Sequence, residues 1–346
     1  MKTTILRLLR GAGVIRLWAG SEWRRRHLLI LCYHGFARRD EHEWNPALYI
    51  TGGQFEQRLN LLRQRGYVVL PLGEALSRLE EGSLPRRAVA LTVDDGNYDF
   101  LAVAYPILVR RGIPATLYAS TYYVLDQRPV FDVMLAYLLW RGVRQGNRTL
   151  HILGLDPRPL DTAITAKSLA GEIRRRAQES GLSPNAKDEL LAEIASQMGE
   201  DYCALCCDRM LSLLSIEELR GLDPGIVDVQ LHTHRHRTPD NRELFLRELA
   251  DNRAALATAG RDPAQLVHFC YPSGVHRPAF LPWLREAGIQ SATTCLPGLA
   301  VKGQDPLLLP RFIDTSLTPV VEFEGWASGL RHLVRRRRRQ FSDVQG

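Results

Sequence analysis

The chain of 346 residues is 45% hydrophobic and 24% charged, a composition typical of a folded globular protein and not of a disordered or fibrous one. Its net charge of +7 is concentrated at the ends, because residues 1–26 carry +6 and residues 331–346 carry +5, which leaves −4 for the rest. This distribution excludes a nucleic-acid-binding domain, whose basic residues would lie along one folded face. No apolar run of about 18 residues predicts a membrane-spanning helix.

The first predicted element is an amphipathic helix over residues 5–18, in which arginines interrupt the apolar residues. A secretory signal needs an unbroken apolar centre, so the sequence favours a cytoplasmic protein. The helix either packs on the body of the protein or lies on a membrane surface. Together with the basic tail 331–346, it favours peripheral contact with an anionic membrane, and a pair of solvated tails is the alternative.

Strands and helices alternate from residue 28 to residue 119. Apolar runs predict strands over 28–33, 67–70, 88–93 and 113–119, and helical periodicity predicts helices over 54–66, 72–81 and 97–111. Glycines at the ends of the helical patterns mark where each helix stops. His34 ends the first strand.

The strand over 88–93 ends in two carboxylates, Asp94 and Asp95, followed by Gly96. Adjacent residues of a strand point to opposite sides, so one aspartate can ligate a cation while the other does something else. Buried carboxylates are costly unless they are paired or bound to a metal. A simple Asp-Gly turn after the strand is the alternative interpretation.

The alternation stops from about residue 120 to 215. Helices are predicted over 130–141, 166–180 and 186–198, and we interpret the whole segment as a helical insertion in the main fold. It contains Cys203, Cys206 and Cys207, which lack a partner pair at zinc-finger spacing.

Three histidines, His232, His234 and His236, follow the strand predicted over 225–231. Imidazole is a common ligand of zinc and similar ions. His232 and His236 converge on one ion if the chain turns after the first of them. An exposed polar loop is the alternative.

Alternation then resumes with a helix over 241–259, a strand over 266–271, a helix over 278–288, and strands over 290–295 and 307–313. Such a pattern, with polar residues at successive strand ends, predicts a parallel α/β sheet or barrel. In such folds the working groups gather at the C-terminal ends of the strands.

Several of these strand ends carry a resemblance to a known family. Thr92-Val93-Asp94-Asp95-Gly96 resembles the first motif of the polysaccharide deacetylases, the NodB-like carbohydrate esterase family 4. His232-Thr233-His234-Arg235-His236 is similar to its second motif, and Phe269-Cys270-Tyr271-Pro272-Ser273-Gly274 to a form of its third. Cys32-Tyr33-His34-Gly35 and Leu309-Pro310-Arg311 resemble strand ends of one bacterial branch. The resemblance runs from about residue 28 to 315.

The resemblance implies a distorted (β/α) barrel over residues 27–330, with the insertion at about 120–215, that binds one divalent cation. Asp95, His232 and His236 would be the metal ligands and Asp94 the base, and Tyr271, Pro272, Ser273 and Gly274 would contact the substrate. The implied metal is zinc, with cobalt, nickel or manganese as alternatives. The implied reaction is hydrolysis of N-acetyl groups on an N-acetylated sugar or polysaccharide.

The sequence departs from the family pattern at the third motif and at the general acid. Cys270 stands where the usual third motif has arginine, and Ser273 where it has tyrosine. Arg311 could supply the missing cation, or it could form a structural salt bridge. The family's acid is a histidine in a Leu-x-His motif, and the matches ending in His268 and His332 lie in the wrong places. His34 is the better candidate, with a hydrogen-bonded core histidine as the alternative.

Two other functions therefore stay open beside the deacetylase. One is a catalytically weakened or inactive protein of this fold that binds glycans. The other is a metallohydrolase acting on another bond, such as an O-acetyl ester.

Overall fold

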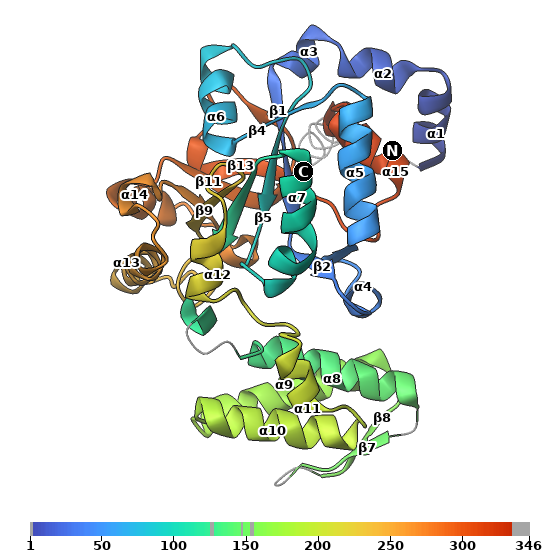
Figure 1. Ribbon diagram of the computed structural model, residues 1–346, viewed down its shortest axis with the longest axis vertical. Coiled ribbons are helices and arrows are strands. Elements are labelled where there is room, and N and C mark those ends of the chain that lie inside the picture. Colours follow the sequence, from blue (N-terminus) through green and yellow to red (C-terminus); the bar gives the residue numbers. More distant parts are fainter. Residues whose placement is uncertain (1–2, 125–127, 147, 153–155, 334–346) are drawn as a thin grey trace, which may run out of the picture. The chain divides into compact units, whose positions relative to one another are not determined.

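The computed structural model describes residues 3–124, 128–146, 148–152 and 156–333. It divides into two compact units, one formed by Met1–Leu125 with Leu214–Gly346 and the other by Asp126–Leu213. Figure 1 labels helices and strands of both units where there is room.

Within the described residues, seven parallel strands of the first unit close into a barrel (Figure 1). Strand β1 pairs on one side with β13 and on the other with β5, which completes the ring. Around the ring the strands are β1 (His27–Tyr33), β13 (Leu309–Ile313), β11 (Ser291–Pro297), β10 (His268–Cys270), β9 (Val227–Leu231), β6 (Ala115–Ala119) and β5 (Ala88–Val93). This confirms the predicted α/β fold class, a (β/α) barrel.

Two short strands extend the sheet beyond the ring. Strand β12 (Ala300–Val301) pairs antiparallel with β1, and β4 (Val68–Leu70) pairs parallel with β5. All seven residues of β1 and all six of β5 are buried, because the barrel interior covers one face of each strand and helices cover the other. That double cover explains why both strands are continuous apolar runs without alternation.

Helices follow the strands as the alternation predicts. The helices of this unit that cover the barrel are α5 (Gly52–Gln64), α6 (Leu72–Glu81), α7 (Tyr105–Arg111), α12 (Ile216–Gly221), α13 (Arg242–Thr258), α14 (Phe280–Glu286) and α15 (Val320–Ala327). The helix predicted over 97–111 is instead a wide π-turn, Phe100–Ala104, followed by α7. Pro106 has no amide hydrogen for the preceding helical turn, which accounts for the irregular start.

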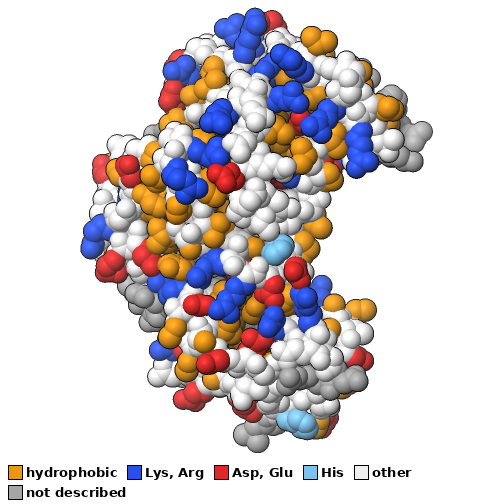
Figure 2. Space-filling model, turned by 45° about the vertical axis from the view of Figure 1, so that its right-hand side comes forward, with side chains coloured by type: hydrophobic (Ala, Val, Ile, Leu, Met, Phe, Trp, Pro, Cys, Tyr) orange, Lys and Arg blue, Asp and Glu red, His pale blue; other side chains and the backbone are white. Residues whose placement is uncertain are grey.

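The N-terminal segment forms three short helices, not the single helix predicted over 5–18. Helices α1 (Thr3–Gly11) and α2 (Val14–Ala19) are separated by Gly13, whose φ of 73° ends the helical path, and α3 (Glu22–Arg25) follows. Leu6 and Ile15 pack in one apolar cluster with Val321 of α15. The segment therefore packs on the body of the protein. In the view of Figure 2, Lys and Arg side chains are numerous on the upper part of the surface.

No helix among the described residues is both long enough and apolar enough to cross a membrane.

The second unit is mainly helical. It contains α8 (Phe131–Gln145), α9 (Ala163–Glu179), α10 (Pro184–Gln197), α11 (Tyr202–Cys207), and the hairpin of β7 (Arg148–Leu150) and β8 (Arg158–Leu160). The three helices predicted here fall on α8, α9 and α10, whereas the hairpin and α11 were not predicted. The proposed division of the chain into an insertion and tails stays a prediction, and residues 334–346 of the basic tail lie outside the described residues.

Candidate active site

Three side chains that the sequence predicts as metal ligands meet at the C-terminal end of the barrel strands. Nε2 of His232 and Nε2 of His236 each lie 3.2 Å from Oδ1 of Asp95. The His232 side chain is buried, whereas 27% of the Asp95 side chain and 42% of the His236 side chain are exposed. The cluster is therefore anchored in the barrel on one side and open to solvent on the other.

Backbone turns at the ends of two strands bring these groups together. β9 ends at Leu231, and after His232 the chain turns at Thr233, which has a φ of 62°; His236 itself has a φ of 52°. Asp95 has a φ of 74°, and Gly96 follows with a φ of 78°. Left-handed backbone at residues other than glycine is strained and persists where the surroundings hold it, as is common at functional sites.

Two polar residues of α13, Asn252 and Glu248, hold the histidine loop in place. The Asn252 side chain accepts a hydrogen bond from the His232 amide at 2.9 Å and donates to Ala119 O and Thr121 Oγ1, both at 3.0 Å. Glu248 accepts from the Arg235 amide at 2.7 Å.

Neither residue was identified from the sequence, although a signal exists. The residues that α13 buries are Phe245, Glu248, Leu249, Asn252 and Leu256. Two polar residues thus occupy the apolar stripe of an amphipathic helix, where a buried polar group needs a partner.

The hydrogen bonds of His232 test whether the cluster fits a cation. Its Nδ1 lies 2.9 Å from the carbonyl oxygen of Cys270. Because a carbonyl only accepts, Nδ1 carries the hydrogen, and the Nε2 lone pair faces the Asp95 carboxylate. Burial alone would lower the pKa of His232, but the hydrogen bond to Asp95 and the charges of Asp94 and Asp95 raise it.

Two acceptors that face each other in this way need a shared proton or a cation between them. The residues present therefore fit a divalent cation, and one carboxylate with two imidazoles is a ligand set suited to zinc.

The neighbouring Asp94 has a different environment, because a buried arginine binds it through two hydrogen bonds. Arg311 Nη1 donates to Asp94 Oδ1 at 2.6 Å, and Nη2 donates to Oδ2 at 2.7 Å. Arg311 also donates from Nε to Thr294 O at 3.0 Å and from Nη1 to Thr92 Oγ1 at 3.1 Å. Burial by itself would raise the pKa of the Asp94 carboxyl, but the charge and hydrogen bonds of Arg311 outweigh it and hold that pKa well below its usual value.

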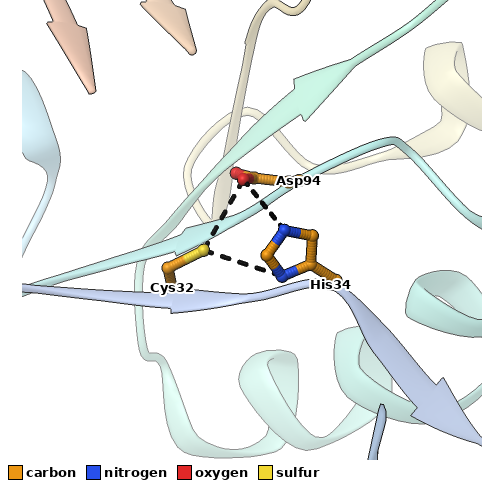
Figure 3. A group of neighbouring side chains, drawn as sticks. All are labelled: Cys32, His34 and Asp94. Atoms are coloured by element: carbon orange, nitrogen blue, oxygen red, sulfur yellow. Dashed lines mark hydrogen bonds and ion pairs between the residues drawn. The ribbon is translucent and has the colours of Figure 1, made fainter. Parts of the chain in front are cut away.

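Two thiols and an imidazole surround the same carboxylate. Cys32 Sγ and Cys270 Sγ donate to Asp94 Oδ2 at 3.5 and 3.4 Å, and His34 Nε2 lies 3.5 Å from the same oxygen. Figure 3 shows Cys32 and His34, both from the end of β1, pointing toward Asp94 at the end of the neighbouring strand β5. Burial raises the pKa of both thiols well above the usual value, so they remain protonated donors. Neither cysteine was predicted to lie in the site.

His34 is held at the mouth of the barrel by a close backbone contact. A side chain at the next residue, Gly35, would meet the Tyr49 ring at 2.3 Å, so only glycine lets the chain pass there. The His34 side chain is 15% exposed, and it lies between the buried carboxylate and solvent.

The third-motif residues occupy two kinds of position. Tyr271 is fully buried and its hydroxyl donates to Leu307 O at 3.0 Å, and Pro272 is also buried. Ser273 is exposed with a φ of 54°, and Gly274 packs against Cys295, where a Cβ would lie 2.8 Å from the Cys295 Cβ. Contact with substrate stays a prediction for all four, and the burial of Tyr271 favours a role in shaping the loop.

The other histidines lie apart from the cluster. His268 is the first residue of β10, at the opposite end of the barrel, and hydrogen-bonds Ser291 Oγ at 2.8 Å. His332 packs near Trp23 and His27 at the start of β1. His234 bonds Thr121 Oγ1 at 2.9 Å and so helps to fix the loop.

An exposed aromatic residue, Tyr122, lies beside the histidine loop. Its amide donates to His234 O at 2.8 Å, its ring packs edge-on against His234, and 44% of the residue is exposed. It was not predicted from the sequence, because a single tyrosine after a strand has no distinguishing pattern.

Comparison with solved structures identifies the fold. The structure is similar to that of a deacetylase, PplD, from Streptococcus pyogenes in complex with acetate, with a TM-score of 0.55 and 18% identity over 86% of this chain and 96% of that one. It is similar to IcaB from Ammonifex degensii, with a TM-score of 0.54 and 19% identity over 88% of this chain and 97% of that one.

A polysaccharide deacetylase from Bacillus cereus gives a TM-score of 0.53 and 17% identity over 87% of this chain and 69% of that one. No protein-family model and no curated protein matches the sequence. The chain therefore has the fold of the polysaccharide deacetylases, as the sequence motifs predict.

Proposed function

We propose that the protein is a metal-dependent hydrolase that removes N-acetyl groups from an N-acetylated sugar or polysaccharide. The observation that carries this proposal is the pairing of two sites at one end of the barrel. Asp95, His232 and His236 converge where solvent can reach them. The buried Asp94 lies beside them and forms an ion pair with Arg311. The fold shared with solved deacetylases supports it.

Asp95, His232 and His236 would hold the cation, with zinc preferred by the ligand set and cobalt, nickel or manganese as alternatives. When bound, the cation supplies Lewis acidity toward an acyl carbonyl and toward water. Asp94 remains ionised throughout the working pH range, so it is ready to accept a proton from the attacking water. Arg311 and the two thiols fix the direction of its oxygens.

His34 is the residue that we assign as the proton donor. Cleavage of an amide releases an amine, which must gain a proton as the carbon–nitrogen bond breaks. His34 Nε2 lies 3.5 Å from Asp94 Oδ2, and the side chain is partly exposed. A proton taken from water by Asp94 can therefore pass to His34 and on to the amine, giving acetate and a free amino sugar.

A second candidate function is hydrolysis of an O-acetyl ester, and the environment of Asp94 favours it. A carboxylate whose pKa is held so low is a weak base. An ester is cleaved more easily than an amide, because its leaving alcohol depends less on protonation. A glycan-binding protein without catalysis would show neither activity.

Acetate release from paired N-acetyl and O-acetyl sugars, with added zinc, cobalt or chelator, tests these proposals. Metal-dependent release from the N-acetyl substrate supports the deacetylase. Release from the ester alone supports the esterase, and binding without release from either supports the non-catalytic protein.

A further inference from the structure

A cavity of about 220 Å³ lies at the opposite end of the barrel from the candidate active site, between the N-terminal helices and the body. Four arginines line it: Arg10 and Arg16 from the N-terminal helices, Arg65 after α5, and Arg87 before β5. Arg87 precedes the first residue of β5 and Asp94 follows its last residue, so the whole length of the barrel separates them. A substrate at the catalytic end therefore does not reach this cavity.

The cavity has an excess of positive charge. Its one carboxylate, Glu324, is buried and pairs with Arg10 Nε at 2.8 Å and with Arg65 Nη2 at 3.2 Å. Four guanidinium groups against this one carboxylate leave a net charge of +3 on the lining. Within the part of the chain that the structure describes, the Arg16 guanidinium has no ion pair. Clustered arginines of this kind favour an anion that accepts hydrogen bonds from several of them, as a phosphate group does.

The helices that supply Arg10 and Arg16 expose apolar side chains. Leu8 is 70% exposed, Leu17 is 78% exposed and Ile5 is 46% exposed. On the other face of these helices, Leu6 and Ile15 are buried in a cluster with Val321 of α15. The exposed leucines therefore do not contribute to the packing of these helices on the core. Exposed leucines among arginines on short helices are typical of segments that lie in a membrane interface.

We propose that this cavity binds the phosphate of an anionic phospholipid headgroup, while Leu8 and Leu17 enter the surface of the leaflet. The arginines contact the phosphate, and the leucines bury their apolar side chains in the leaflet. A soluble phosphate would leave those leucines exposed to water. The protein would thus dock on the membrane by the end of the barrel opposite to the catalytic cluster. The inference stands independently of the proposed deacetylase activity.

Vesicle co-sedimentation of the full chain tests the proposal. The probes are vesicles of phosphatidylcholine alone and of equal parts phosphatidylcholine and phosphatidylglycerol. The variants are Arg16→Glu and Leu17→Glu. The matched controls are Arg247→Glu, an exposed arginine of α13, and Leu317→Glu, an exposed leucine at the catalytic end, where 64% of the residue is accessible.

Binding to the anionic vesicles alone is the expected result. One arginine near an anionic surface contributes about fivefold in partitioning, so the charge reversal in Arg16→Glu should weaken binding by roughly 25-fold. Leu17→Glu should weaken it more than tenfold through lost apolar burial. Both controls should bind as the wild type does, and circular dichroism confirms that all four variants are folded.

Two results would overturn the proposal. One is equal vesicle binding by the wild type, Arg16→Glu and Leu17→Glu, which would assign the attraction to the five arginines of residues 335–339. The other is a rise in melting temperature with inorganic phosphate, lost in Arg16→Glu, without any vesicle binding, which would make the cavity a site for soluble phosphate. Both results would leave acetate release unchanged, so they are separable from a failure of the proposed function.

Discussion

Arg311 and Asp94, which lie 217 positions apart in the chain, form a fully buried ion pair with two hydrogen bonds of 2.6 and 2.7 Å. The pair lies beside Cys270, which stands where the motif that the sequence resembles has an arginine. The guanidinium of Arg311 reaches Asp94 from a different strand, and its Nη2 lies 3.1 Å from Cys270 Sγ. The cation beside Asp94 therefore comes from β13 and not from β10, the strand that carries Cys270.

Replacing Arg311 with Met should destabilise the protein by about 3–5 kcal/mol, because it leaves the buried Asp94 carboxylate without a partner. Urea unfolding measures the loss. The double variant Asp94→Asn with Arg311→Met should recover much of the stability without recovering acetate release. Equal stability of Arg311→Met and the wild type would show that the pair is not buried as described.

Removal of the metal should abolish acetate release, and zinc or cobalt should restore it. Asp95→Ala and His232→Ala should each lose the bound metal, measured as metal per chain by elemental analysis, and His151→Ala in the second unit is the matched control. The affinity for the metal should fall as the pH falls, because the raised pKa of His232 lets a proton compete with the metal for its Nε2 atom. Full activity of Asp95→Ala in chelator would exclude the proposed site.

Asn252→Leu should weaken metal binding by about 10–100-fold without removing any ligand, because Asn252 holds the His232 amide and the end of β6. Metal titration followed by activity measures this change. Asn60→Leu on α5 is the matched control, because Asn60 accepts a hydrogen bond from Arg111 at 2.8 Å and lies on another helix. Unchanged metal affinity in Asn252→Leu would rule out the proposed role of α13.

The elements that could be predicted from the sequence are those with a clear hydrophobic pattern and a proline or glycine near each end. The bounds of α6 and β5 match the prediction, because Pro71, Gly82 and Pro85 bracket apolar runs of unambiguous length. The gathering of polar groups at the C-terminal strand ends follows from one rule about parallel strands. The choice of Asp95 with His232 and His236 as the ligand set came from the resemblance to the polysaccharide deacetylases.

Of the surroundings of Asp94, Arg311 was expected from the sequence as one of two alternatives, whereas the two thiols were not expected. Cys32, Cys270 and Arg311 come from three different strands, and which of their side chains point to one carboxylate depends on the register and closure of the barrel. The break at Gly13 was also missed, because an isolated glycine is tolerated inside many helices and the tertiary contacts of Leu6 and Ile15 decide the outcome.

His34→Gln should lower the rate of N-acetyl hydrolysis by about 10²–10⁴-fold if His34 protonates the leaving amine. The same variant should lose much less activity toward an aryl acetate, whose leaving phenolate needs no proton. The ratio of the two rates therefore separates proton donation from a general disturbance of the site. An equal loss on both substrates would assign His34 to the support of Asp94 instead.

His268 should make the folded state less stable in acid. It is 8% exposed, and burial lowers its pKa to about 4. The unfolded chain takes up this proton below a pKa of about 6.5, whereas the folded chain resists it until pH 4, so stability is full above pH 6.5 and falls as the pH drops through this window. The loss approaches about 3 kcal/mol at pH 4. Urea unfolding in chelator at pH 7.5 and 4.5 should show a smaller loss for His268→Gln than for the wild type, and parallel losses would mean that His268 is protonated in the folded state.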